Sequence, residues 1–141
     1  SQRPEHVAAH ALNMFRLIGS PAFAQDMPAF EQRVLADAVR SHNPAGVARQ
    51  LLAVASDTQR HTVLQQVACP TLVVHGTADP LVPMACGQDT AARIAGARFE
   101  SIDGMGHDWP PGVAALLAGH IVPHLQAAQA FATSASNTAP T

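Results

Sequence analysis

Residues 71–83 read TLVVHGTADPLVP, a short apolar run followed at once by a loop that contains two prolines. The run over residues 71–75 is rich in β-branched side chains and lies between a proline and a glycine, which predicts a short strand. Because its residues are continuously apolar rather than alternating, we expect a strand buried on both faces, as in a parallel sheet. The loop places a carboxylate, Asp79, just beyond the end of this strand.

A second polar loop lies one helix and one strand further along the chain. A helix is expected from about Ala85 to Ile94, and the alternating residues 97–102, ARFESI, predict another strand. The loop after that strand carries His107. Strand, helix and strand in this order predict a parallel pair with a right-handed crossover. Because parallel strands present their carboxyl ends at one edge of the sheet, we expect Asp79 and His107 to lie close together.

The first 66 residues are predicted to form a layer of amphipathic helices separated by proline and glycine breaks. Helices are expected over about residues 4–18, 28–40, 44–55 and 58–67. On the second of these helices, Phe30, Val34 and Val39 are expected to face inward. Asn43 is expected to cap the third helix, and Asp57 or Thr58 the fourth.

The carboxyl-terminal region is predicted to hold one more helix and a tail. The helix is expected over about residues 112–131, bent or interrupted near Pro123. Residues 132–141 are Ser, Thr, Ala and Asn with one proline, and we expect them to be disordered.

The composition excludes several classes of function. The chain has 141 residues, of which 48% are hydrophobic and 13% charged, and its net charge is −2. Such a chain has no basic surface for nucleic acid or an anionic membrane. It also has no run of 18 apolar residues that would span a bilayer, and its first residues lack the apolar core of a signal peptide. Two cysteines, Cys69 and Cys86, are too few for a disulfide framework, so a cytoplasmic location is expected.

An ordered set of motifs resembles a known enzyme family. LVVHGTADPLVP at residues 72–83, IAGAR at 94–98 and GMGHD at 104–108 together resemble the carboxyl-terminal third of α/β-hydrolase-fold enzymes. NPAGVARQ at residues 43–50 is similar to the last cap helix of a subgroup that includes aclacinomycin-type methylesterases and related small-ester hydrolases. One departure is Trp109, which stands where a smaller apolar residue is usual and would alter the pocket wall.

The resemblance implies a partial α/β-hydrolase fold and a catalytic role for two residues. It implies a helical cap-like segment over residues 1–66 and the last βαβα part of a parallel sheet over 67–131, followed by the tail. In this family the acid follows the seventh strand and the base histidine follows the eighth. The matching positions are Asp79 as acid and His107 as base of a catalytic triad, with no cofactor.

The third member of such a triad, the nucleophile, is missing from the sequence. No G-x-S-x-G pentapeptide occurs, and Gly19-Ser20-Pro21 is not one, because proline follows the serine and no strand precedes it. Since the family order is nucleophile, acid, base, we expect the elbow upstream of Ser1 and the chain alone to be inactive. In the longer enzyme a serine would attack a small or medium apolar ester. An aspartate nucleophile and carbon–carbon, epoxide or halogenated substrates stay open.

A non-enzymatic interpretation stands beside this one. The chain would then be a truncated gene product, or one half of a split protein that acts only by docking on a partner. Two parallel strands alone leave an unpaired apolar edge, which invites the missing amino-terminal half or a second copy of the chain. No nucleic-acid or membrane partner is expected.

Other polar residues have simpler interpretations. Asp103 and Asp108 flank the His107 loop and are expected to be loop or helix-start residues, and His75 to be bonded to the backbone or to line a pocket. Cys86 is not expected to be the nucleophile, because it lies between the acid and the base in sequence and no nucleophile-elbow motif surrounds it. Two histidine pairs have i, i+4 spacing but lack the glutamate of H-E-x-x-H, so no metal site is expected; they are His6 with His10 and His120 with His124.

Overall fold

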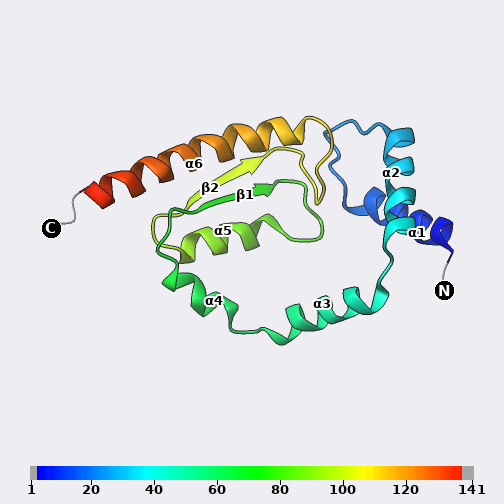
Figure 1. The fold of residues 1–141 in the computed structure, drawn as a ribbon, viewed down its shortest axis with the longest axis horizontal. Helices are drawn as coiled ribbons and strands as arrows, with labels where there is room; N and C mark the ends of the chain where they lie inside the picture. Colours follow the sequence, from blue (N-terminus) through cyan, green and yellow to red (C-terminus); the bar gives the residue numbers. More distant parts are fainter. Residues whose placement is uncertain (1–2, 138–141) are drawn as a thin grey trace.

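The computed structural model, which describes residues 3–137, centres on two short parallel strands (Figure 1). β1 (Leu72–Gly76) pairs with β2 (Arg98–Ile102), and the register places Val74 opposite Glu100. Both strands and their parallel pairing match the sequence prediction. The side chains over residues 72–75 are only half-buried, less than the apolar run predicted, because β2 is the sole strand neighbour of β1 in the described part of the chain.

Helices cover both faces of this small sheet (Figure 1). α5 (Met84–Arg93) makes the crossover between the strands and packs on one face, while α6 (Val113–Asn137) lies on the other. The core between α6 and the sheet consists of the buried side chains of Ile102, Met105, Val113 and Leu117, against which Phe23 and Val74 pack. This core lies beside the loop that follows β2, and it therefore supports the loop that carries His107.

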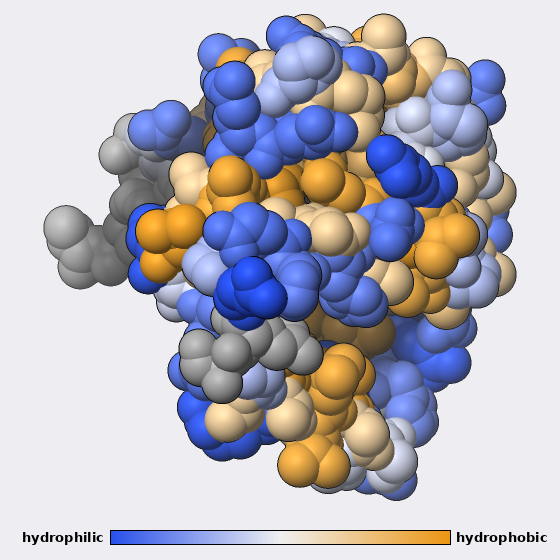
Figure 2. Space-filling view, turned by 90° about the vertical axis from the view of Figure 1, so that its right-hand side faces the viewer, coloured by the Kyte–Doolittle hydropathy of each residue, from blue (hydrophilic) through white to orange (hydrophobic). Residues whose placement is uncertain are grey.

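The amino-terminal helices α1 (Pro4–Ile18) and α2 (Met27–Arg40) pack against each other beside the sheet edge at which both strands end (Figure 1). The rings of Phe15 and Phe30 join the two helices, with centroids 4.3 Å apart. Figure 2 shows apolar side chains at several places on the surface of this end of the molecule.

One expected inward residue of α2 faces solvent instead. Phe30, Val34 and Ala38 are half-buried, whereas the side chain of Val39 is 67% exposed. Steps of four residues keep a side chain on one stripe of a helix, and a step of five from Val34 turns it away. The expectation for Val39 was therefore wrong.

The next segments extend away from the sheet. α3 (Pro44–Ser56) begins as predicted, with the Asn43 side chain accepting a hydrogen bond from the Gly46 N–H at 2.9 Å. α4 (Arg60–Val63) and a short 3₁₀ turn, η1 (Leu64–Gln66), lead on to β1. The N-cap of α4 is Gln59, so the prediction of Asp57 or Thr58 was wrong.

Asp57 has a different partner from the one expected. Its Oδ2 lies 2.9 Å from Arg60 Nε, so the carboxylate pairs with a side chain rather than with free backbone N–H groups of the helix. The backbone at Asp57 serves as the C-cap of α3 instead.

α6 is longer than predicted. It continues through Pro123 without interruption and past the expected end at Phe131 to Asn137. Alanine is the strongest helix former, and residues 127–136 contain five alanines, which favours continuation. Residues 138–141 of the expected tail lie outside the described residues. Within residues 3–137, none of the helices combines the length and apolar character that a membrane crossing requires.

Candidate active site

The loops after β1 and β2 meet at the carboxyl edge of the sheet. The N–H of Thr77 donates to the carbonyl of Ile102, and the N–H of Ala78 donates to the carbonyl of Met105, both at 3.0 Å. The Met105 carbonyl also sits where a Cβ on Gly76 would lie, so only glycine permits this close approach. The two loops are thus held together by backbone contacts before any side chain is considered.

These contacts bring Asp79 and His107 together. His107 Nδ1–H donates to Asp79 Oδ2 at 2.8 Å. The other carboxylate oxygen, Oδ1, accepts from the backbone N–H groups of Leu81 and Val82, each at 2.9 Å. The Asp79 side chain is only 7% exposed, whereas that of His107 is 43% exposed. The carboxylate is therefore fixed on both sides, and the imidazole reaches solvent.

The surroundings of Asp79 favour its ionised form. Burial by itself raises the pKa of the Asp79 carboxyl, but the N–H of Val82, the His107 ring and the N–H of Leu81 together hold it below its ordinary value of 3.8. At neutral pH the group is consequently a carboxylate that can only accept hydrogen bonds. It fixes the proton of His107 on Nδ1 and leaves Nε2 as the basic nitrogen.

A second histidine supports the acid loop. His75 Nε2–H donates to the Val82 carbonyl at 2.9 Å and lies 4.0 Å from Asp79 Oδ2. Its ring rests against Gly87 of α5, where a Cβ would overlap Nδ1. His75 is thus bonded to the backbone, as expected, and it braces the turn whose N–H groups hold Asp79.

The two flanking aspartates have other partners. Asp103 Oδ1 accepts from the Thr77 hydroxyl at 3.0 Å, a contact that ties the two loops together. Asp108 Oδ1 accepts from the Ser20 hydroxyl at 2.5 Å. Each carboxylate therefore has a partner other than His107, in agreement with the interpretation of both as loop residues.

The segment that follows α1 contacts the loop that carries His107, and this contact was not predicted. The N–H of His107 donates to the Ile18 carbonyl at 2.7 Å, and the N–H of Gly106 donates to the Ser20 hydroxyl at 2.8 Å. No local sequence motif predicts these contacts, because Ser20 and Gly106 are 86 positions apart in the chain. The only available signal was a serine and a proline directly after a helix end.

A cavity of about 260 Å³ adjoins the pair. Its walls are largely apolar, and they are formed by the ends of both strands and the two loops: Val74, His75, Gly76, Asp79, Val82, Met105, Gly106, His107, Asp108 and Trp109. Trp109 is 77% exposed and lies at the rim. The arrangement offers an acid–base pair beside an apolar wall.

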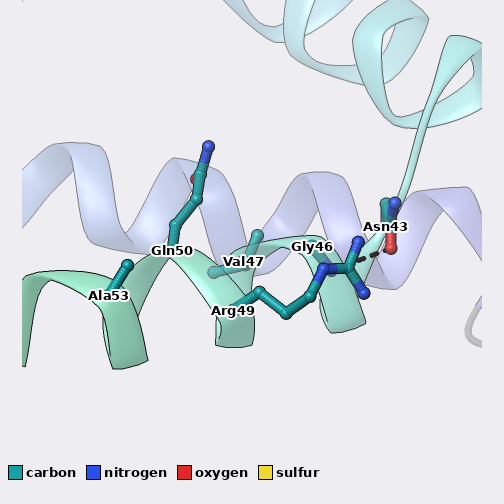
Figure 3. A pocket seen from close by; sticks show the side chains of 6 residues that line it. All are labelled: Asn43, Gly46, Val47, Arg49, Gln50 and Ala53. Atoms are coloured by element: carbon teal, nitrogen blue, oxygen red, sulfur yellow. Dashed lines mark hydrogen bonds between the residues drawn. The ribbon is translucent and has the colours of Figure 1, made fainter. Parts of the chain in front are cut away.

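A larger cavity lies elsewhere and lacks comparable chemistry. It measures about 570 Å³ and follows one side of α3 (Figure 3), where it is lined by Asn43, Gly46, Val47, Arg49, Gln50 and Ala53. Its polar groups are amides and one guanidinium, and they include no acid–base pair. Within residues 3–137 no group of three or more His, Cys, Asp or Glu side chains is placed to hold a metal ion.

A protein-family model matches most of the chain. The family model described as TAP-like protein, an α/β-hydrolase family, matches residues 34–120, which is more than half of the chain. The matched region contains both strands, α5, and the two loops that carry Asp79 and His107. The chain belongs to the TAP-like protein family and represents a carboxyl-terminal region of the α/β-hydrolase fold.

Proposed function

We propose that this chain supplies the acid and the base of a hydrolase catalytic triad. The observation that carries the proposal is the 2.8 Å hydrogen bond between His107 Nδ1 and Asp79 Oδ2 at the carboxyl edge of the sheet. Ligands of open α/β sheets bind at this edge. In this role Asp79 orients the imidazole, and His107 moves the proton.

The proton transfers follow from the tautomer that Asp79 enforces. Nε2 takes the proton of a nucleophile hydroxyl as its oxygen attacks the ester carbonyl, and the Asp79 carboxylate stabilises the resulting imidazolium. The imidazolium then gives this proton to the departing alkoxide, which leaves as an alcohol. In the second half, Nε2 accepts a proton from water as the water oxygen attacks the acyl-enzyme. The imidazolium then returns this proton to the nucleophile oxygen as the acyl–enzyme bond breaks, which releases the carboxylic acid and restores the starting enzyme. No cofactor takes part in these steps.

The nucleophile belongs to sequence outside residues 1–141 in this proposal. The chain contains no G-x-S-x-G elbow, and Ser20 is engaged with Asp108 and Gly106. A serine elbow upstream of residue 1 suits ester hydrolysis, and an aspartate there would suit epoxide or halide hydrolysis. The 141-residue chain alone is proposed to be inactive.

The proposed substrate is a small or medium apolar ester. Val74, Val82, Met105 and Trp109 give the cavity beside His107 its apolar wall. The similarity of residues 43–50 to the last cap helix of aclacinomycin-type methylesterases supports the same class. We accordingly propose that residues 1–66 form a cap and residues 67–131 the hydrolase core, from which α6 continues to Asn137. A cytoplasmic location is proposed separately, from the presence of only two cysteines.

Two observations favour a second candidate function. β1 pairs with β2 alone in the described part of the chain, and the apolar side chains of α3 face solvent, with Val47, Leu51, Leu52 and Val54 between 57% and 69% exposed. A non-catalytic chain that docks on a partner, either an amino-terminal hydrolase half or another copy of itself, would cover both features.

The two candidates are separated by the coding DNA and by ester turnover. An open frame that carries G-x-S-x-G upstream of residue 1 favours the enzyme, whereas a stop codon or frameshift favours the docking chain. In the longer enzyme, His107→Ala is expected to abolish hydrolysis of p-nitrophenyl acetate, and His42→Ala, at an exposed position, is expected to leave it unchanged. Equal turnover by His107→Ala and the parent enzyme contradicts the assignment of the base.

A further inference from the structure

The connection between α1 and α2 lies directly across the loop that carries His107. Three of the hydrogen bonds that join them lie at residues 106–108: His107 N–H to the carbonyl of Ile18, the last residue of α1, Gly106 N–H to the Ser20 hydroxyl, and the Ser20 hydroxyl to Asp108 Oδ1. Their lengths are 2.7, 2.8 and 2.5 Å, so all three are well formed. The connection thus holds His107 and both of its neighbours in sequence.

The two backbones also approach each other closely beside these bonds. The Gly19 carbonyl and the Ile18 oxygen occupy the space where a Cβ on Gly106 would lie. Two positions beyond Ser20, the N–H of Ala22 donates to the Gly104 carbonyl at 3.3 Å. The two segments therefore run backbone against backbone.

Ser20 is the centre of this contact. It is only 9% exposed. Its hydroxyl donates one hydrogen bond, to Asp108, and accepts another, from the Gly106 N–H. Asp108 Oδ2 is buried and has no partner among the described residues. The hydrogen bond from Ser20 to Oδ1 therefore satisfies only one of the two oxygens of the Asp108 carboxylate.

Residues 106–108 lie beyond the bonds that hold residues 102–105 to the first loop, and they need a support of their own. Residues 104–106 read GMG, and two glycines allow the backbone many conformations when it is released. The hydrogen bond to Asp79 fixes only the far end of the His107 side chain. The direction from which the imidazole approaches Asp79 is set by the backbone of residues 106–108, and that backbone is held from the α1–α2 connection.

We propose that Ser20 is a positioning residue for His107: by bonding Gly106 and Asp108 it fixes the loop so that the imidazole meets Asp79. The catalytic consequence rests on the proposed function, whereas the positioning itself does not. The segment that joins the two amino-terminal helices thereby becomes part of the machinery that keeps the base in its working tautomer.

The test follows the His107 ring in the whole 141-residue chain by NMR. Nitrogen shifts at alkaline pH report the fraction of neutral imidazole that carries its proton on Nδ1, and solvent exchange of that proton reports how often the bond to Asp79 opens. Asp79→Asn supplies the reference for a lost bond. Ser20→Ala is expected to lower the Nδ1–H fraction and to speed its exchange about tenfold or more. This corresponds to a loss of about 1.4 kcal/mol of local stability.

Matched variants separate positioning from general stability. Ser56→Ala removes an exposed hydroxyl that donates to the Ala53 carbonyl in α3 and is expected to leave the His107 signals unchanged. Asp108→Asn keeps an oxygen acceptor for Ser20 and is expected to resemble the parent chain, whereas Asp108→Ala is expected to resemble Ser20→Ala. If Ser20→Ala does not fold, Asp108→Ala decides. Parent-like tautomer and exchange in the folded variant overturn the proposal.

A second readout distinguishes failure of this inference from failure of the proposed function. In the longer enzyme, Ser20→Ala is expected to lower kcat and leave KM near its parent value, because the base is displaced and the substrate wall is not. Normal turnover by His107→Ala contradicts the proposed function but does not affect the positioning role measured by NMR. Normal NMR signals in Ser20→Ala contradict the positioning role but do not affect the proposed catalytic roles of Asp79 and His107.

Discussion

His107 and Asp79 are hydrogen-bonded at 2.8 Å although 28 positions separate them in the chain. The contact exists because β1 and β2 are adjacent and parallel, so that the loops after them leave the sheet at the same edge. Asp79 is buried and held by two backbone N–H groups, while the imidazole is partly exposed. A buried carboxylate with three hydrogen bonds therefore orients an imidazole that solvent can reach.

Replacing the acid tests this relationship most directly. In the longer enzyme, Asp79→Asn is expected to lower kcat by on the order of a thousandfold or more, because the amide no longer enforces the Nδ1–H tautomer of His107. Steady-state ester hydrolysis measures the effect. Asp37→Asn, which alters an exposed partner of Arg40, is the control and is expected to keep the parent rate. A near-parent rate for Asp79→Asn would move the acid to another residue.

The same carboxylate predicts how stability depends on pH. The pKa of Asp79 in the folded chain lies below its ordinary value of 3.8, so the folded state releases the proton more readily than the unfolded state. Its contribution to stability is therefore fully present above about pH 3.8 and is lost as the pH falls through the lower, folded pKa. Urea unfolding at several pH values is expected to show a steeper acid loss in the parent chain than in Asp79→Asn.

This pH experiment needs a control because other carboxyl groups of the chain titrate in the same acidic range. Arg93 lowers the pKa of Asp89, and Arg98 lowers that of Glu100, both on the surface. Solvent screens such exposed pairs, so Asp89→Asn is expected to change the acid loss less than Asp79→Asn does. If the two variants give the same curve, the special stabilisation of the Asp79 carboxylate is refuted.

Trp109 offers a test of the proposed substrate class. It lies at the rim of the cavity beside His107 and is 77% exposed, so it is available to cover an apolar acyl or alkyl group. Trp109→Ala in the longer enzyme is expected to raise KM for apolar esters about tenfold, with little change in kcat for the smallest esters. Leu125→Ala, an exposed apolar residue of α6, is the control. An unchanged KM across an ester series would remove Trp109 from the substrate site.

The sequence predicted what local pattern and sheet topology determine. The apolar run of β1, the alternation of β2 and the proline starts of three helices are all local signals, and the rule for parallel strands then brought Asp79 and His107 to one edge. Errors occurred where several weak local preferences compete. The alanines after Pro123 favour a longer α6, which ends at Asn137 rather than at Phe131. The N-cap of α4 is Gln59, one position after Thr58.

The contact of Ser20 with Gly106 and Asp108 was not predictable in this way. Ser20 is separated from Gly106 by 86 positions and from Asp108 by 88, and no sequence pattern links residues so far apart. Gly19-Ser20-Pro21 itself has the composition of an ordinary turn. The contact depends on where the α1–α2 connection passes over the sheet edge. That path is a property of tertiary packing, which local sequence patterns do not determine.

Two glycines with opposite surroundings provide a sharp test of that packing. A Cβ on Gly106 would overlap the Gly19 carbonyl and the Ile18 oxygen, and these backbone groups cannot rotate away as a side chain would. Gly106→Ala is therefore expected to lower the free energy of unfolding by about 1–3 kcal/mol, the usual cost of overpacking. Gly119 lies inside α6 with nothing within 4 Å of its Cβ position, so Gly119→Ala is expected to raise the free energy of unfolding by about 0.5–1 kcal/mol. Chemical denaturation of both variants measures the two signs. A Gly106→Ala chain as stable as its parent would mean that the α1–α2 connection does not press on the His107 loop.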